Sequence, residues 1–205
     1  MSFRLLSVVT LLAGVTLIGS SALHAQARAP NKSTAEVYKA FLSSWRGNDK
    51  APINVAEDAE ALSKQDLEEF SSCAGGHHEW APAATNASLA TQLSALPWLR
   101  FVDPTKWQAA DPGNLIAKGK PVDEAVEQGF SHALLTLSTV AFDSSGEFAA
   151  LKYSLVCGRL CGNGGTVLFE HSGQGWVRSK KRCGMWLSRS GRPNISFKAD
   201  GFAAA

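Results

Sequence analysis

The chain lacks an excess of charge of either sign. Its 205 residues include 20 lysines and arginines against 18 aspartates and glutamates, which gives a formal net charge of +2 at pH 7. Proteins that bind nucleic acids or other anionic polymers over much of their surface usually have a marked basic excess. The composition therefore gives no reason to expect a nucleic-acid partner, and we predict none.

Recognisable catalytic motifs are also absent. The sequence has no Gly-x-Ser-x-Gly elbow, no His-Glu-x-x-His and no dinucleotide-binding fingerprint. The glycine-rich run 162–165 leads into a strand-like stretch, whereas a phosphate-binding loop leads into a helix. A zinc site on His77, His78 and Glu79 would need a second ligand pair at a diagnostic spacing, and none is present. We therefore predict no cofactor and no metal site, and we assign no catalytic residue.

Long apolar runs are scarce. The apolar run 5–18 follows Arg4 and precedes a small-residue segment that ends at Ala27, which is typical of a cleaved secretory signal. It is shorter than the roughly 20 apolar residues of a spanning helix. We interpret residues 1–27 as a signal peptide, 28–190 as a single α+β domain and 191–205 as a C-terminal tail. We expect a periplasmic or extracellular bacterial protein with no membrane insertion after signal cleavage.

Cysteine is sparse but even in number. In an exported chain, Cys73, Cys157, Cys161 and Cys183 are first interpreted as disulfides, with three pairings open. A glycine-rich loop can bring the α-carbons of Cys157 and Cys161 within the roughly 4.4–6.8 Å that a disulfide requires. That pairing would leave Cys73 with Cys183. The three residues between Cys157 and Cys161 differ from the C-x-x-C spacing of thioredoxin-like redox sites.

The first half of the chain has helical signals. Ser33 and Glu36 have the spacing of a capping box, and an apolar stripe from Tyr38 to Trp45 predicts a helix over 35–46. Start and stop signals predict three more helices, from Ser63 to near Cys73, from Asn86 to Pro97 and from Pro121 to Gly129, with Gly129 just past the end. We expect a short strand at 53–55 and an irregular segment at 103–120.

After Gly129 the pattern changes to that of strands. Four runs are rich in β-branched and aromatic residues: 133–142, 148–156, 166–171 and 176–187. Connections this short join neighbouring antiparallel strands. We therefore expect an α+β fold in which N-terminal helices pack on one face of a C-terminal antiparallel β-meander of about four strands.

The segment 137–188 resembles a group of uncharacterised exported bacterial proteins. The similarity is strongest in Cys157-Gly-Arg-Leu-Cys161-Gly-Asn-Gly164, and it includes Leu137-Ser-Thr-Val-Ala-Phe142, Gly175-Trp-Val177 and Trp186-Leu-Ser188. The segment Lys180-Lys-Arg-Cys183 departs from the pattern of that group, which leaves the pairing of Cys183 open. The resemblance implies bacterial export and a hairpin around the two cysteines. It implies no catalytic residue.

Two functional hypotheses follow. The first is a non-catalytic binding domain for an envelope component or a partner protein, with Arg159, Leu160 and Asn163 as a contact loop held by the cysteines. The second is an envelope hydrolase in which His171 or His132 pairs with an acid in space. The tryptophans beside prolines, Trp80 and Trp98, are further candidates for an exposed contact surface.

Overall fold

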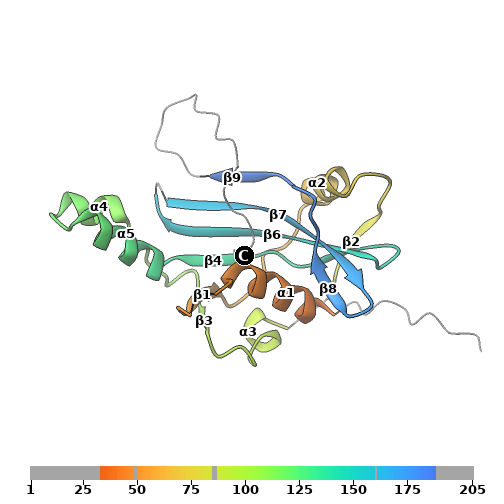
Figure 1. Ribbon diagram of the computed structural model, residues 1–205, viewed down its shortest axis with the longest axis horizontal. Coiled ribbons are helices and arrows are strands. Elements are labelled where there is room, and N and C mark those ends of the chain that lie inside the picture. The colour runs from red at the N-terminus through yellow and green to blue at the C-terminus, as the bar shows by residue number, and fades with distance from the viewer. Residues whose placement is uncertain (1–32, 49, 85–86, 160, 188–205) are drawn as a thin grey trace, which may run out of the picture.

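The computed structural model describes residues 33–187 apart from 49, 85–86 and 160, so the predicted signal peptide, tail and domain boundaries lie outside the described residues. The described chain contains five helices: α1 (Thr34–Arg46), α2 (Lys64–Ala74), α3 (Leu89–Gln92), α4 (Pro112–Ala117) and α5 (Val122–Ser131) (Figure 1). It also contains nine strands: β1 (Ile53–Ala56), β2 (Trp80–Pro82), β3 (Leu99–Val102), β4 (Leu134–Leu137), β5 (Ala141–Asp143), β6 (Phe148–Gly158), β7 (Cys161–Ser172), β8 (Gly175–Arg178) and β9 (Met185–Leu187).

All nine strands belong to one mixed sheet. Strand β6 pairs with β7 along almost its whole length, and β5 and β4 share its other edge. Strands β8 and β9 pair in turn with β7. Beyond β4 the sheet continues with β1 and β3, and both contacts of β1 are parallel. Strand β2 forms the opposite end of the path, next to β5.

The predicted simple meander of about four strands is therefore wrong. Strands β1, β2 and β3 come from the N-terminal half and enlarge the sheet, and β1 and β3 do so in parallel. The short strand expected at 53–55 is confirmed as β1, whereas β2 and β3 were not predicted, because three or four residues are too few for a period-2 pattern to stand out in the sequence. The expectation that the helices pack on one face of the sheet is also wrong. Helices α1 and α2 cover opposite faces, because they contact strand side chains that point in opposite directions.

Alternation along β6 separates the two cores. Leu151 and Tyr153 point to the face covered by α1, where the larger apolar cluster includes Tyr38 and Phe41. Ala150 points to the other face and joins the smaller cluster around Phe70 of α2. The helices thus cover the two faces of the same pair of strands.

Each outer edge of the β6–β7 pair is paired with two short strands that are separated by a break: β4 and β5 along β6, and β9 and β8 along β7. Between β4 and β5 the Ser138 carbonyl accepts a buried hydrogen bond from the Tyr38 hydroxyl at 2.9 Å, and burial raises the pKa of Tyr38. Between β8 and β9 the ladder bonds run from Ser179 to Leu168 and from Thr166 to Gly184. Residues 180–183 therefore bulge out of the sheet, opposite Val167 alone.

Several helix boundaries match the predictions and others differ. Helix α1 begins one residue early, with the Ser33 hydroxyl accepting from the Glu36 amide, and α2 has a complete capping box of Ser63 and Asp66. Helix α3 is shorter than predicted and is capped by Ser88, while Asn86 lies outside the described residues.

The predictions for 103–120 and for Gly129 were wrong. Helix α4 lies within 103–120, and its first residues are set by the Asp111 cap and Pro112. Gly129 lies inside α5 and does not terminate it. A Cβ at this position would lie 2.5 Å from Cγ of Pro112. The glycine therefore permits the close packing of α4 on α5 and is not a helix stop.

The disulfides connect very different lengths of chain. Cys73 of α2 pairs with Cys183 of the bulge, across 110 residues, and Cys157 pairs with Cys161 across four. By the chain-entropy model, the first disulfide lowers the entropy of the unfolded chain and so adds about 5 kcal/mol to the free energy of unfolding, and the second adds about 2 kcal/mol.

We predict that Cys73→Ala/Cys183→Ala lowers the free energy of unfolding more than twice as much as Cys157→Ala/Cys161→Ala does. Urea titration of both double variants, followed by circular dichroism, measures the two losses. If both double variants lose the same free energy of unfolding, the stabilisation by each disulfide is not set by the length of the chain segment that it closes.

Candidate functional site

The predicted contact loop is the end of the β6–β7 hairpin. Cys157 and Cys161 lie with their α-carbons 5.1 Å apart and close the turn between the two strands. Arg159 is in the turn with its side chain 83% exposed, and Asn163 is in β7, between Leu155 of β6 and Leu187 of β9. Leu160 lies outside the described residues. The structure therefore separates Asn163, which is a strand residue, from the exposed side chain of Arg159.

This turn is fixed against helix α4. The Arg159 amide donates to Oδ2 of Asp111 at 2.8 Å, while Oδ1 of Asp111 accepts from the Asn114 amide at the start of α4. The Arg159 amide is the main cause that holds the pKa of Asp111 below its ordinary value. Gly158 allows the approach, because a Cβ there would lie 3.0 Å from Cα of Asp111. The turn and the helical pair α4–α5 thus form one continuous end of the molecule.

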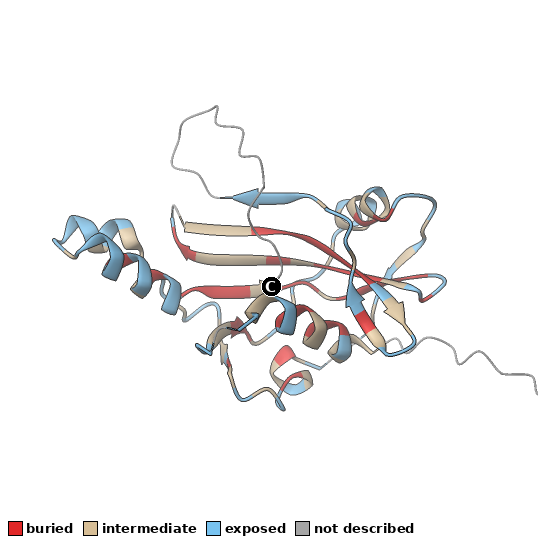
Figure 2. Ribbon diagram, in the orientation of Figure 1, coloured by how far each residue is buried: buried red, intermediate tan, exposed pale blue. Residues whose placement is uncertain are grey.

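Helix α5 presents an exposed apolar stripe at this end. Val122, Val126 and Phe130 are spaced four residues apart, and the first and last are 59% and 55% exposed. The buried side of the helix is formed by Ala125 and Gly129, and Gly129 lies against Pro112 of α4. Figure 1 shows α4 and α5 projecting from the end of the sheet, and Figure 2 shows that both are largely exposed. We call Val122, Val126 and Phe130 the α5 stripe.

Acidic side chains follow the α5 stripe around the helix. At about 100° per residue, Asp123 and Glu127 come next after the stripe, and Glu124 lies beyond them. Glu124 pairs with Lys120 at 3.5 Å. For Asp123 and Glu127, no lysine, arginine or histidine of the described chain lies within ion-pair distance. The surface is therefore apolar on one side and negatively charged on the other.

Sequence reasoning missed the α5 stripe. The i, i+4, i+8 spacing was visible in the sequence, but an apolar stripe on a helix usually indicates the side that faces the core. In this helix the core side is formed by small residues instead, so the larger apolar side chains remain in solvent. The sequence signal that could have identified the exposed stripe is the i, i+4 spacing of the small residues Ala125 and Gly129, which lie side by side on the adjacent side of the same helix.

The histidine–carboxylate contact of the described residues involves neither predicted histidine. Nδ1 of His78 lies 3.3 Å from Oδ2 of Asp143, and Nε2 lies 3.2 Å from the Gly75 carbonyl oxygen. Both partners are acceptors, so both bonds form together only when the imidazole donates from both nitrogens. Ser145 donates to the same carboxylate at 2.5 Å and not to the imidazole, unlike the serine of a catalytic triad.

Asp143 has a structural role in this cluster. Its carboxylate accepts from the Phe148 amide at 3.0 Å as well as from Ser145 and His78. Burial alone would raise the pKa of Asp143, but these hydrogen bonds outweigh it and lower the pKa. The carboxylate therefore fixes the β5–β6 turn and connects it to the segment after α2.

The two histidines of the hydrolase hypothesis lie elsewhere. Nδ1 of His132 lies 3.0 Å from the Gln128 carbonyl and 3.1 Å from the Ser131 hydroxyl, at the end of α5. The ring of His171 packs against Trp176 with the ring centroids 4.9 Å apart. Within the described residues, neither ring lies within 4 Å of a carboxylate.

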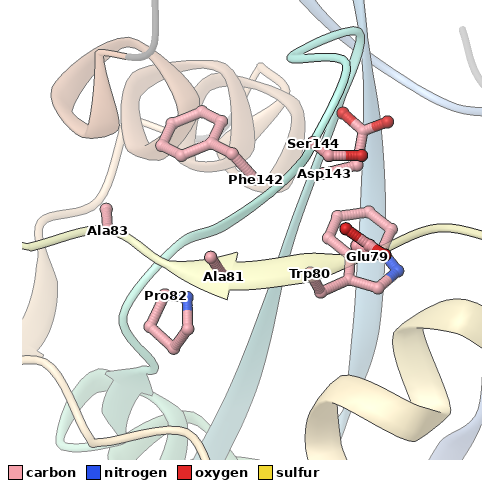
Figure 3. A pocket seen from close by; sticks show the side chains of 8 residues that line it. All are labelled: Glu79, Trp80, Ala81, Pro82, Ala83, Phe142, Asp143 and Ser144. Carbon is pink, nitrogen blue, oxygen red and sulfur yellow. The ribbon is translucent and has the colours of Figure 1, made fainter.

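An open hollow of about 380 Å³ lies beside the edge strand β2 (Figure 3). Its lining comes from β2, β5 and the residues next to them: Glu79, Trp80, Ala81, Pro82, Ala83, Phe142, Asp143 and Ser144. Nε1 of Trp80 is buried, and no hydrogen-bond acceptor for it is found among the described residues. The lining offers mainly apolar contact.

No group of three histidine, cysteine or acidic side chains in the described chain is arranged to hold a metal ion. No helix among residues 33–187, as far as these are described, has the length and apolar character needed to cross a bilayer.

Trp98, the other tryptophan proposed as a contact residue, lies under the guanidinium of Arg46 at 4.5 Å from the ring centroid. Trp98 is therefore part of an internal packing contact with α1.

A charged cluster attaches α2 to the sheet. Nζ of Lys152 in β6 lies 2.5 Å from Oδ1 of Asp66 and 3.4 Å from Oε2 of Glu69, and Thr166 of β7 donates to Oε1 of Glu69. Burial opposes ionisation of Asp66, yet hydrogen bonds from Lys152 and Ser63 lower its pKa from 3.8 to about 2. Because the folded pKa is the lower one, Asp66 stabilises the fold above pH 4, and this contribution is lost as the pH falls toward 2.

We predict that Lys152→Met destabilises the protein most above pH 4, and that its stability approaches that of the unchanged protein near pH 2. Urea unfolding between pH 2 and pH 6 measures both curves. Lys64→Met, which removes an exposed lysine of α2, the helix that carries Asp66, is the matched control and should change the stability little. If the free energies of unfolding of the Lys152→Met protein and the unchanged protein differ by the same amount at every pH, Lys152 is not what lowers the pKa of Asp66.

Comparison of the chain with protein-family models, with curated protein sequences and with solved structures gave no match. The similarity of segment 137–188 to exported bacterial proteins therefore stays a prediction. The α5 stripe and the adjoining Arg159 turn lie together at the disulfide-closed end of the β6–β7 hairpin, and both are exposed.

Proposed function

We propose that this is an exported, non-catalytic binding protein that holds a partner protein through the α5 stripe. The observation that carries the proposal is the solvent exposure of Val122, Val126 and Phe130 along one line of a helix. Apolar side chains so arranged form the interface by which helices pack on one another. Because each is already about half buried, burial of its exposed remainder in a partner would contribute roughly 1 kcal/mol.

The charges beside the stripe define the partner further. Asp123 and Glu127 form an acidic line next to the apolar line, with no basic residue in α5 itself. A partner helix with apolar residues on one side and lysine or arginine beside them would match both lines. The partner we propose is therefore a basic amphipathic helix of another envelope protein.

The surroundings of the stripe support a rigid binding surface. Helix α5 packs on α4 through Gly129 and Pro112, and the cap of α4 is bonded to the disulfide-closed turn at Arg159. Preorganisation of this kind reduces the entropy lost on binding. Arg159 lies at the margin of the proposed interface, so it would contribute less than the stripe does.

Location outside the cytosol is part of the proposal. Two disulfides, which persist in oxidising compartments, support it, as does the signal-like sequence of residues 1–27. We propose the periplasm or the cell exterior as the place where the partner is met.

We predict that Val122→Asp abolishes partner capture, because an uncompensated carboxylate would be buried in the apolar interface. The matched control is Val177→Asp in β8, since Val177 is 56% exposed and Val122 is 59% exposed. Affinity capture from envelope extracts of the producing cells, with mass spectrometry of the bound proteins, compares the two variants. The Val122→Asp protein should retain less than about a tenth of the partner, and the Val177→Asp protein should retain nearly all of it.

A cross-linking experiment identifies the contact directly. A photoreactive residue placed at 126 should give one discrete product with the partner, which the change Asp123→Lys/Glu127→Lys should remove. Arg159→Ala should weaken the capture only slightly. If the photoreactive residue at 177 gives the same product as the one at 126, or if Val122→Asp captures normally, α5 is not the interface.

A further inference from the structure

The free edge of strand β9 carries exposed apolar side chains next to unpaired bases. Met185, Trp186 and Leu187 are 68%, 43% and 64% exposed, and β9 pairs on one side only, with β7, among the described strands. The preceding bulge adds the exposed bases Lys180 and Arg182. We call these five residues the β9 rim.

The geometry of the rim is fixed by the fold. The bulge at 180–183 is held to α2 by the Cys73–Cys183 disulfide, and Nζ of Lys181 donates to the Ala74 carbonyl at the end of α2. Trp186 lies over Gly164 of β7, where a Cβ would come 2.4 Å from the indole Nε1. The backbone of the bulge and of β9 is therefore attached to α2 and β7, which places the bases beside the apolar edge.

Acidic groups do not neutralise the rim. No carboxylate of the described chain lies within 4 Å of the charged ends of Lys180 or Arg182. Glu69, the acid that approaches Gly184, is already bonded to Thr166 and Lys152. The positive charge of the rim is thus available to an external anion.

The apolar residues surround the edge on both sides. Side chains alternate along a strand, so Met185 and Leu187 point to one face of the sheet and Trp186 points to the other. A soluble anionic polymer would use the bases and leave these three side chains in water. A bilayer surface offers phosphate groups for the bases and, just below them, an apolar layer in which tryptophan and leucine are stable.

We propose that the β9 rim docks the protein on the surface of a membrane that contains anionic phospholipids. The contact is peripheral: the edge of β9 enters the headgroup layer, with Trp186 on one face of the sheet and Met185 and Leu187 on the other at the apolar boundary, and with Lys180 and Arg182 on the phosphates. This surface is separate from the α5 stripe and opposite to it in charge, so the inference does not depend on the proposed partner protein.

The test is sedimentation of the purified chain from residue 28 onward with vesicles. Vesicles of equal parts phosphatidylglycerol and phosphatidylcholine should bind the protein at low salt, and vesicles of phosphatidylcholine alone should not. Arg182→Glu should weaken binding at least about tenfold, because a surface-bound base is replaced by a repelled acid. Arg100→Glu is the matched control, because Arg100 is exposed on the distant edge strand β3 and its loss should change binding little.

The apolar part of the rim is tested separately. Leu187→Ser and Trp186→Ser should each weaken vesicle binding severalfold, with unchanged circular dichroism and with the disulfides intact. Equal weakening by Arg100→Glu, or an absence of binding to the anionic vesicles, would overturn the proposal. A third result would also overturn the proposal: soluble polyphosphate binds as tightly as anionic vesicles do, and Leu187→Ser and Trp186→Ser leave vesicle binding unchanged. The site would then recognise only anions. Loss of partner capture by Val122→Asp would not change any of these results.

Discussion

The pairing of β6 with β7 is the interaction on which the rest of this structure depends. It runs from Phe148 opposite Glu170 to Gly158 opposite Cys161 and is closed at the far end by a disulfide. Every shorter strand of the C-terminal half aligns along one of its two outer edges. Its two faces, distinguished by the alternation of side chains, receive α1 on one side and α2 on the other. The position of both proposed binding surfaces follows from this pair of strands.

The two surfaces are made by different means. The α5 stripe is exposed because small residues occupy the buried side of its helix, so the packing of α5 on α4 requires none of the larger apolar side chains. The β9 rim is exposed because a bulge interrupts the strand beside β7 and leaves β9 as a short edge. One surface is bordered by acids and the other by bases. The two proposed surfaces are therefore built from different elements and bordered by opposite charges, and neither uses a residue of the buried core.

Local signals in the sequence predicted the local elements well. Hydroxyl and acidic residues at helix starts located α1 and α2, and the spacing of Cys157 and Cys161 favoured the pairing that the structure contains. The failures concern long-range relations. Nothing in the four residues of β1 indicates that they pair in parallel with both β3 and β4. Likewise, His78 meets Asp143 only through the fold, 65 positions away, so the histidines singled out from the sequence were not the ones brought to a carboxylate.

The place of β1 in the sheet constrains the order in which the chain can fold. Residues 53–56 lie between β3 at 99–102 and β4 at 134–137, so both strands that pair with β1 are synthesised after it. Pairings between segments so distant in sequence form slowly, because the intervening chain must first lose its conformational freedom. Residues 33–102, as far as the structure describes them, therefore cannot complete the sheet before β4 has been synthesised. Until the β6–β7 hairpin has formed, they stay open to chaperones and to proteases.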